Sequence, residues 1–345
     1  LELKDEIEKM KKKRRKKKSG LNRILGLLLT LALLAAGAFL AYWFIDVPSG
    51  GISISIPGIG GASERDFAVY FVDVGQGDAA VVVCDGKTLV IDGGTDEGGD
   101  ALCTYLRNTL QPAQIDYMIA THPHADHIGG LPDVLKAYTV KKLYSPVDVY
   151  DSRTFERMAQ YAADQGLSIT VAQAGQSFSL GRAKVEFLAP LGIYDDINDI
   201  SLVAKVTFGE TTFLFTGDAE RPSEQDMADS DEDLSATVLK VGHHGSNTSS
   251  SYVFLRNVMP QYAVISCGAG NSYGHPHEEV LSRLRDINAT VYRTDLNGTV
   301  VCRSDGKNVS FTVEKGSKPV ETPRPELKGG YIGNMKSKKF HTPDC

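Results

Sequence analysis

Three histidines and an aspartate lie within six positions of this sequence, at His122, His124, Asp126 and His127. Imidazole and carboxylate groups together form a donor set that suits Zn²⁺, Mn²⁺ or Fe²⁺. On an extended or tightly turned loop, His122 and His124 point the same way, because side chains alternate. Asp126 and His127 then project elsewhere after the turn. The spacing therefore predicts ligands for two separate metal ions.

Further ligands are expected after two apolar segments later in the chain. Asp218 follows Phe213-Leu214-Phe215, and a carboxylate at the end of a strand can bridge two cations. His243 and His244 follow the segment 237–241. One of them should bind metal, while the other contacts substrate or supports a ligand from behind. Spacing does not separate the two; we favour His243 as the ligand, because it comes first after the strand, and give His244 a catalytic role.

These residues need sheets to position them. Segments rich in β-branched and aromatic residues alternate with helical patterns, which indicates sheets with helices outside them. Strands are expected at 67–74, 79–84, 88–91, 115–120, 183–188, 201–208, 211–216, 237–241, 262–266, 290–292, 298–303 and 308–313. Helices are expected at 100–110, 128–138, 155–165 and 277–287. The strand at 115–120 ends directly before the histidine cluster.

Seven short motifs, in this order, resemble one known family. They are Phe71–Asp78 (FVDVGQGD), Ile91–Gly94 (IDGG), Thr121–Leu131 (THPHADHIGGL), Asn198–Leu202 (NDISL), Phe215–Asp218 (FTGD), Leu239–Ser246 (LKVGHHGS) and Tyr273–His277 (YGHPH). The third contains the H-x-H-x-D-H signature of the metallo-β-lactamase superfamily. Together the motifs resemble the extracellular metallohydrolase domain of ComEC-type competence proteins and their stand-alone, membrane-anchored relatives. The resemblance covers residues 67 to about 313.

The resemblance implies an α/β (α+β) fold, a four-layer αββα sandwich with the metal ions at one edge of its two sheets. It implies that His122, His124, Asp126, His127 and Asp218 are ligands. Many superfamily members carry a further histidine before the bridging aspartate. Here no histidine lies between His127 and His243, and Asn198 occupies that stretch. One metal is therefore expected to have a more open shell, so that the two divalent ions are Zn²⁺ or Mn²⁺.

Further residues of the motifs are expected to line the same edge. His275 resembles a substrate-side residue of the family, so that a phosphate contact or a proton donor is expected there; a structural histidine in a proline turn is the alternative. The remaining candidates form two groups. Asn198, Ser246, Gln76 and Asp78 are expected to bind substrate, and Asp92 and Asp73 to orient ligands from behind.

The beginning of the chain has the pattern of a membrane anchor. Residues 1–20 carry ten Lys and Arg against four Asp and Glu, which predicts a basic cytoplasmic tail. Residues 21–45 are almost wholly apolar and long enough for one transmembrane signal-anchor helix. Tyr42 and Trp43 suit the membrane interface. The catalytic domain is then extracellular; cleavage of a signal peptide and secretion is the alternative.

The remaining boundaries follow from composition. Residues 46–66 are rich in Gly, Ser and Pro, which predicts a flexible linker. The hydrolase domain is expected at 67–315, and 316–345 reads as a linker and a truncated C-terminal tail with one cysteine. The formal net charge of −6 includes the basic tail, so the rest is acidic. Five cysteines without zinc-finger spacing are expected to be core residues, and no essential disulfide is expected.

The chemistry predicted from these residues is metal-assisted hydrolysis. A water molecule between two cations is deprotonated near neutral pH and attacks phosphorus or a carbonyl carbon. His275 or the second histidine of the 243–244 pair would aid the leaving group. The resemblance implies a phosphodiester substrate, DNA outside the cell. Asp126, His275 and His244 are the expected catalytic residues.

Two alternatives stay open. The first keeps the metals and changes the substrate, to a phosphocholine or teichoic-acid phosphodiester, a lactone or a β-lactam. The second is a non-catalytic DNA-binding ectodomain. A single apolar span cannot form a DNA pore. Besides the membrane at residues 21–45, the expected partner is DNA or another phosphodiester, and no obligate protein partner is evident.

Overall fold

The computed structural model describes residues 67–316, 319, 332–334 and 339–341. The expected basic tail, anchor helix and first linker therefore lie outside the described residues. Of the helices that are described, none is both long and apolar enough to span a membrane. Near the C-terminus, β16 (Ile332–Asn334) and β17 (Lys339–His341) form an antiparallel pair.

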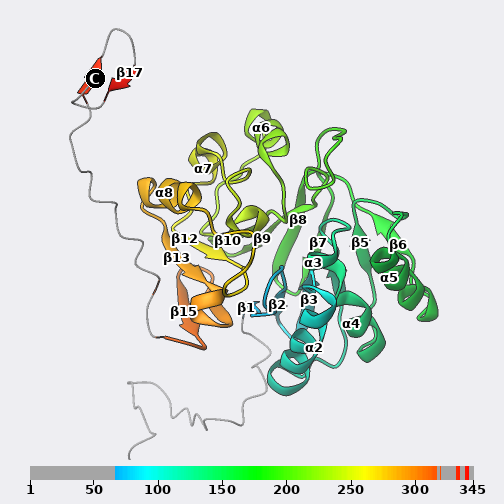
Figure 1. Ribbon diagram of the computed structural model, residues 1–345. Helices are drawn as coiled ribbons and strands as arrows, with labels where there is room; N and C mark the ends of the chain where they lie inside the picture. The colour runs from blue at the N-terminus through cyan, green and yellow to red at the C-terminus, as the bar shows by residue number, and fades with distance from the viewer. Residues whose placement is uncertain (1–66, 317–318, 320–331, 335–338, 342–345) are drawn as a thin grey trace, which may run out of the picture. The chain divides into compact units, whose positions relative to one another are not determined.

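Two sheets form the body of the molecule (Figure 1). One has eight strands in the order β15-β14-β1-β2-β3-β4-β5-β6 and the other seven in the order β13-β12-β11-β10-β9-β8-β7. The first comprises β1 (Phe67–Phe71), β2 (Ala80–Cys84), β3 (Lys87–Ile91), β4 (Tyr117–Ile119), β5 (Leu143–Ser145), β6 (Ile169–Val171), β14 (Val300–Ser304) and β15 (Val309–Val313). The second comprises β7 (Ser177–Leu180), β8 (Ala183–Ala189), β9 (Val203–Phe208), β10 (Thr211–Phe215), β11 (Val238–Lys240), β12 (Tyr262–Ile265) and β13 (Thr290–Arg293).

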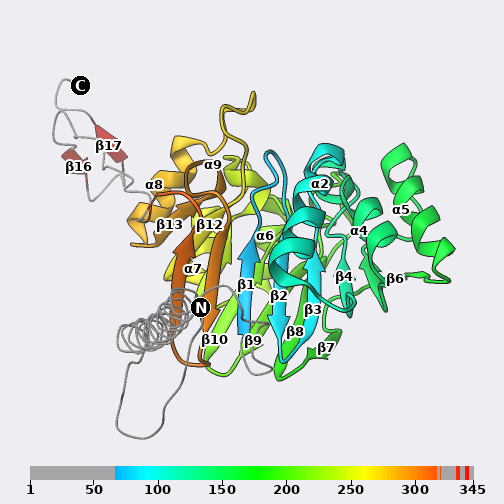
Figure 2. The same ribbon diagram turned by 90° about the horizontal axis from the view of Figure 1, so that it is seen from below.

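Helices cover the outer face of each sheet, which gives four layers (Figure 2). The eight-stranded sheet packs against α2 (Asp96–Tyr105) with its π-helical continuation (Leu106–Leu110), α3 (Ala125–Ile128), α4 (Leu131–Ala137) and α5 (Arg153–Asp164). The seven-stranded sheet packs against α6 (Arg221–Asp229), α7 (Tyr252–Val258) and α8 (Glu278–Asp286). A single turn, α9 (Thr294–Asn297), follows β13. This is the mixed α/β, two-sheet architecture that the motifs implied.

Three hydrophobic clusters hold the layers together. The first lies between the sheets and stacks Phe67 on Phe208, with ring centroids 4.7 Å apart. The second and third lie between each sheet and its helices. The four cysteines of the described body are buried free thiols: Cys84 and Cys302 in the first cluster, Cys103 in the second and Cys267 in the third.

The expected helix boundaries differ from the structure near the histidine cluster. The helix expected at 100–110 begins at Asp96, because Thr95 caps it by accepting a hydrogen bond from Gly98 N (3.1 Å). Glycine obscured this start, but Gly99 is required by packing: a Cβ there would lie 2.7 Å from the Cα of Gly130. The loop expected to carry Asp126 and His127 contains the helical turn α3.

Other elements were missing from the expectation. Strands β5, β6 and β7 have only three or four residues, and Ser177 and Ser179 alternate with apolar residues on an edge strand. In α6, Met227 is the only buried apolar side chain, so its sequence lacks a helical apolar stripe.

Candidate metal centre

Four strand ends bring the chemically active residues to one edge of the two sheets. His122 follows β4, and Asp92 follows β3, which runs parallel to it. Asp218 follows β10 and His244 follows the parallel β11. The carboxyl ends of parallel strands lie at the same edge, so the eight-stranded sheet supplies one half of the site and the seven-stranded sheet the other.

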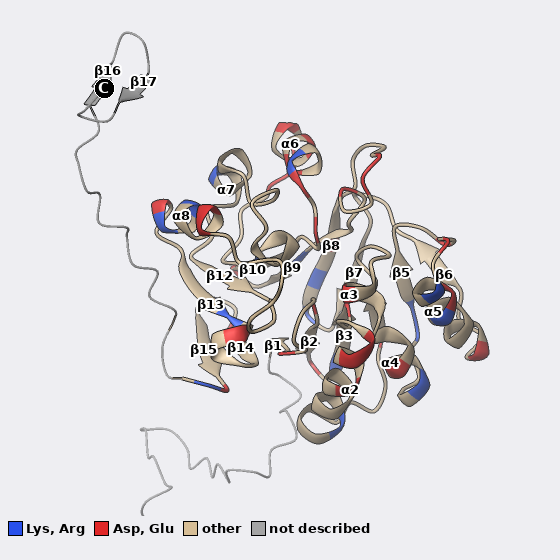
Figure 3. Ribbon diagram, viewed as in Figure 1, with Lys and Arg blue, Asp and Glu red and all other residues tan. Residues whose placement is uncertain are grey.

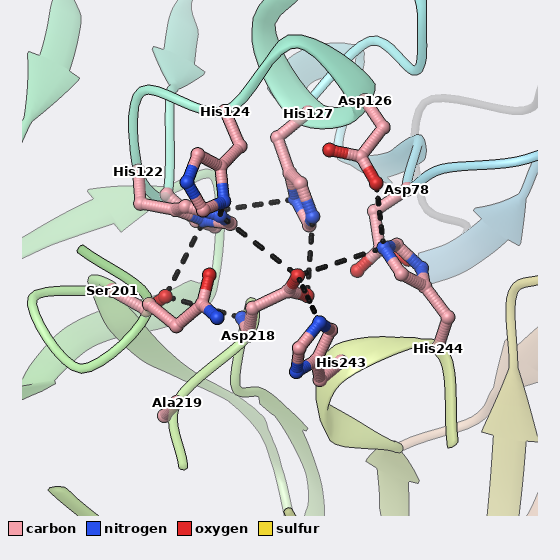
Figure 4. Close-up of polar contacts among 12 residues, drawn as sticks. Asp78, His122, His124, Asp126, His127, Ser201, Asp218, Ala219, His243 and His244 are labelled. Atoms are coloured by element: carbon pink, nitrogen blue, oxygen red, sulfur yellow. Dashed lines mark hydrogen bonds and ion pairs between the residues drawn. The ribbon is translucent and has the colours of Figure 1, made fainter. Parts of the chain in front are cut away.

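The first group of potential metal ligands consists of His122, His124 and Asp218. His122 Nε2 lies 3.1 Å from His124 Nδ1 and 3.9 Å from Asp218 Oδ2. His122 and Asp218 are buried, whereas His124 is partly exposed, so this group opens toward solvent. Figure 4 shows both imidazoles directed at the carboxylate from one side.

The second group shares Asp218 and adds Asp78, His127 and His244, all buried. His127 Nε2 lies 3.1 Å from Asp218 Oδ1, and His244 Nε2 lies 3.6 Å from Asp218 Oδ2. Asp218 thus faces both groups, in the manner of a carboxylate that bridges two cations.

The donor atoms of the second group fit a bound cation. Four of its buried atoms have no hydrogen-bond partner among the described residues: Asp78 Oδ1, His127 Nε2, Asp218 Oδ1 and His244 Nε2. Buried polar atoms are rarely left unsatisfied in folded proteins. Imidazole nitrogens and carboxylate oxygens that converge without hydrogen bonds are the arrangement that a divalent ion satisfies.

Asp92 holds His127 in the orientation that binding requires. Its Oδ2 lies 2.8 Å from His127 Nδ1 and accepts a hydrogen bond from Thr121 Oγ1 (2.7 Å), while its Oδ1 accepts one from Thr121 N (2.8 Å). A hydrogen bond from Nδ1–H to a carboxylate fixes the tautomer and leaves Nε2 free for a metal. This contact is of the kind expected for Asp92.

The loop after β11 has an unusual backbone conformation at His243 and His244, whose Nδ1 atoms have different partners. Both residues have positive φ, 48° and 54°. Consecutive non-glycine residues in this region are strained, and such strain persists where the surroundings impose it. His244 Nδ1 lies 3.1 Å from the carbonyl oxygen of Ser266, which turns Nε2 toward Asp218. His243 Nδ1 instead lies 2.9 Å from Glu220 Oε1.

The buried carboxylates and imidazoles of the cluster shift one another's pKa values. Burial opposes a charge on His127, yet Asp218 and Asp92 raise its pKa well above the ordinary value. Burial also opposes a charge on His244, but Asp218 and Asp78 raise its pKa to about 10. Burial and the neighbouring His127 lower the pKa of His122. Divalent cations bind deprotonated ligands and displace such protons.

His243 and His244 take different positions relative to the two groups of potential ligands. His244, expected to be catalytic, belongs to the second ligand group, and His243, expected to be the ligand, belongs to neither. The reason is the local backbone: both residues adopt the left-handed conformation, so their order in the sequence does not decide which side chain joins the group. His243 Nε2 still lies 3.6 Å from Asp218 Oδ2, at the border of the site.

Asp126, expected as ligand and catalytic residue, lies beside the second group. Its Oδ2 is 3.2 Å from His244 Nε2, and its side chain is 30% exposed. Asp73, expected to support the ligands, points elsewhere: its Oδ2 pairs with Lys315 Nζ at 3.0 Å. The Asp73 carboxylate is therefore directed toward the segment after β15 and not toward the histidines.

The expected substrate residues have different positions. Asp78 belongs to the second ligand group, and its Oδ2 pairs with Lys240 Nζ at 2.6 Å. Gln76 Oε1 accepts a hydrogen bond from Gly268 N, which ties two loops of the edge together. Ser246 Oγ contacts Thr248 Oγ1 at 2.9 Å, inside its own loop.

Asn198 and His275 each present a buried atom without a hydrogen-bond partner among the described residues, Oδ1 and Nδ1 respectively. Asn198 donates through Nδ2 to Glu220 (3.4 Å). The ring of His275 lies 5.7 Å from that of His243, and burial together with His244 lowers its pKa to about 4. His275 is therefore placed at the rim, beside both histidines.

Three further residues of the site had not been expected. Lys240 is a buried cation beneath Asp78, Ser201 Oγ accepts a hydrogen bond from Asp218 N (3.1 Å), and Glu220 contacts His243. A lysine inside the apolar strand β11 was the available signal for the first. Serine and glutamate in loops carry no such signal, because the same residues are common at any surface.

Comparison with known proteins gives one family and several partial relatives. A family model described as the metallo-beta-lactamase superfamily matches residues 72–269. The chain is 32% identical over 264 residues to ComE operon protein 3 of Bacillus subtilis, covering 71% of this chain and 34% of that protein. It is 31% identical over 272 residues to Competence protein ComA of Neisseria gonorrhoeae, covering 78% and 36% respectively. The chain spans about a third of the length of these relatives.

Proposed function

The chain belongs to the metallo-beta-lactamase superfamily, and from this premise we propose that it is a metal-dependent phosphodiesterase that hydrolyses DNA. The observation that carries the proposal is the position of Asp218, whose carboxylate is shared by two groups of potential ligands. Paired divalent sites of this kind suit in-line displacement at phosphorus, where both the attacking and the leaving oxygen need a cation.

The donor set suits two divalent ions, Zn²⁺ or Mn²⁺. Bound there, they would supply Lewis-acid stabilisation and lower the pKa of a water molecule. The residues of the chain divide the other tasks. Asp92 holds His127, Lys240 holds Asp78, and Glu220 holds His243 with its Nε2 toward Asp218. His275, at the rim, is placed to contact the phosphate or the leaving group.

The choice of DNA rests on the relatives. One of them is named Competence protein ComA, and a third, Recombination protein 2 of Haemophilus influenzae, is 31% identical over 244 residues, covering 69% of this chain and 29% of that protein. Acidic and basic residues are mixed over the helices (Figure 3), so affinity for DNA must come from local sites.

We place the domain outside the cell, tethered by residues 21–45. The support is the sequence: a run of Lys and Arg from Lys11 to Lys18 precedes an apolar segment of spanning length. Secretion after cleavage of that segment is the alternative. Modification of an engineered surface cysteine by a membrane-impermeant reagent in intact cells, followed by fractionation, separates a tethered from a released domain.

The hydrolysis is tested with the full chain carrying Asp218→Asn, assayed with Mn²⁺ and with Zn²⁺. Substrates are bis-p-nitrophenyl phosphate, single-stranded DNA, double-stranded DNA and a β-lactam. Because Asn cannot bridge two cations as a carboxylate does, we expect phosphodiester hydrolysis to fall by more than about a hundredfold. Asp229→Asn, an exposed position on α6, is the matched control.

Undiminished phosphodiester hydrolysis by a folded Asp218→Asn protein would contradict the role of the paired sites. Wild-type turnover of the small diester without turnover of either DNA would contradict the DNA substrate and leave the chemistry standing. Turnover of the β-lactam alone would contradict both.

A further inference from the structure

The two sheets part at the end of β4 that lies opposite the metal centre. Tyr117 begins this strand and His122 follows its far end, five residues later, which corresponds to roughly 16 Å of extended chain. Two cavities of about 280 and 470 Å³ open here, and both are lined by Lys142 and Tyr144. They adjoin each other at the open side of the sandwich, between the edge strands β6 and β7.

Aromatic rings from both sheets line this opening. Tyr117 of β4 stacks on Phe178 of β7 with centroids 4.1 Å apart, and Tyr144 of β5 lies 5.3 Å from Phe178. Tyr117 lies on the same face of its strand as Ile119, which belongs to the cluster between the sheets. All three rings are only partly buried. The stack therefore continues the core outward and presents aromatic surface to solvent.

Lysines surround the aromatic rings. Lys87 and Lys141 lie at the mouth with side chains 48% and 47% exposed, and Lys142 Nζ lies 5.6 Å from the ring centre of Tyr144. Of the described residues that line the larger cavity, Asp116 is the one carboxylate. It pairs with both Lys87 (3.4 Å) and Lys141 (3.1 Å), so three positive charges meet a single negative one.

We propose that this aromatic slot, formed by Tyr117, Tyr144 and Phe178 with Lys87, Lys141 and Lys142 at its mouth, binds single-stranded nucleic acid. Aromatic faces take up unpaired bases and neighbouring cations contact the phosphates, which is the chemistry of sequence-tolerant single-strand binding. Asp116 is one negative charge beside three lysines, so the mouth keeps a net positive charge that attracts phosphates. Duplex DNA, whose bases are already stacked, cannot use the rings.

The slot would retain a polymeric substrate away from the metal centre. This use rests on the proposed function, but binding at the slot does not depend on hydrolysis. Binding is therefore measured with EDTA present, and hydrolysis is measured separately on bis-p-nitrophenyl phosphate, which is too small to reach both sites.

The test measures fluorescence anisotropy of a labelled oligothymidylate titrated with the full chain over a series of salt concentrations. In Lys87→Gln/Lys142→Gln, Asp116 keeps Lys141 as its partner, so folding is undisturbed. Two lost phosphate contacts should weaken binding at least about fivefold and reduce the slope of log K against log salt by about 1.4. Lys136→Gln/Lys307→Gln, exposed lysines elsewhere, removes the same charge and should change neither quantity.

A second variant tests the rings. Tyr117→Leu keeps the charge and should weaken oligothymidylate binding roughly tenfold while leaving polyphosphate binding unchanged. If Tyr117→Leu weakened the binding of oligothymidylate and of polyphosphate equally, the rings would not be recognising bases, and the proposal would be overturned.

The proposal is also overturned if the wild-type chain does not bind the oligonucleotide, or if the lysine variant and its control bind alike. The proposal is supported if the lysine variant hydrolyses bis-p-nitrophenyl phosphate at the wild-type rate but binds the oligonucleotide more weakly. A defect at the metal centre gives the opposite pattern, so the two failures are distinguishable.

Discussion

The histidine pair after β11 shows how much chemistry depends on single backbone angles. Both residues have positive φ, and in this conformation His244 joins the second group of potential ligands while His243 contacts Glu220. Without His244, the second group would keep three donors, Asp78, His127 and Asp218. The identity of the ligand is therefore a property of conformation.

We expect His244→Ala to lose about one of two bound metal equivalents, while His243→Ala keeps both, because His244 is a member of the second group of potential ligands and His243 lies at its border. Metal content after gel filtration, measured by plasma mass spectrometry, provides the comparison. His277→Ala, a histidine outside both groups that accepts a hydrogen bond from Asn247 N, is the control. Loss of metal from His243→Ala with retention by His244→Ala would restore the order expected from the sequence.

The sequence specified much of this site because metal ligands are restricted in type. His122, His124, His127 and Asp218 were identifiable from spacing and from the strands before them. Asp78 was placed at the same edge but in another role, because its distance to His127 depends on how β2 pairs with β3. Ser201 lies inside the Asn198–Leu202 motif, but its contact with Asp218, like that of Glu220 with His243, arises from loop packing and was not predicted.

At the scale of elements, the helices on the seven-stranded sheet are joined by a buried carboxylate. Glu224 of α6 accepts hydrogen bonds from the backbone N–H groups of Ser250 and Ser251, directly before α7 (2.8 Å to Ser251). Burial raises the pKa of Glu224 to about 7, despite these donors. The contact holds the segment that follows His243 and His244 against α6.

This shift makes the contribution of Glu224 to stability depend on pH. Its folded pKa lies above the unfolded value of 4.5, so the contribution is complete below pH 4.5 and is lost as pH rises to about 7. Relative to Glu224→Gln, wild-type stability should therefore fall by about 3 kcal/mol between those limits. Urea unfolding at several pH values measures the difference. Met227→Leu, a buried neutral change on the same helix, should show a constant offset; a constant offset for Glu224→Gln would refute the prediction.

The strands were more predictable than the helices on this side. Apolar runs such as Phe213–Phe215 indicate a buried strand, whereas α6 lies in polar sequence and is held by contacts such as that of Glu224. Local sequence cannot report a helix whose stability comes from distant partners.

At the scale of the molecule, the metal centre joins the two sheets. His122, His124 and His127 extend from the eight-stranded sheet, and Asp218 and His244 from the seven-stranded one. A cation that is coordinated by residues of both sheets binds the native state only, because the unfolded chain does not bring these residues together. Binding therefore stabilises the packing of one sheet on the other.

Adding Mn²⁺ or Zn²⁺ at a hundredfold excess over its dissociation constant should stabilise the fold by about 2.7 kcal/mol. For a body of this size that corresponds to a rise in melting temperature of roughly 5–10 °C. Differential scanning calorimetry of the full chain with and without metal measures it. Asp218→Asn should show little of this shift; an equal shift in the variant would mean that the ion binds elsewhere.

The distribution of the cysteines allows the unfolding of each layer of the body to be followed separately. Each hydrophobic cluster contains at least one thiol: Cys84 and Cys302 between the sheets, Cys103 on the buried face of α2, and Cys267 on the side of α7 and α8. Burial raises the pKa of the Cys267 and Cys302 thiols to about 12. A thiol so placed reacts only when its own layer separates. Alkylation rates at the separate cysteines would thus give the order in which the layers come apart, without the introduction of a probe.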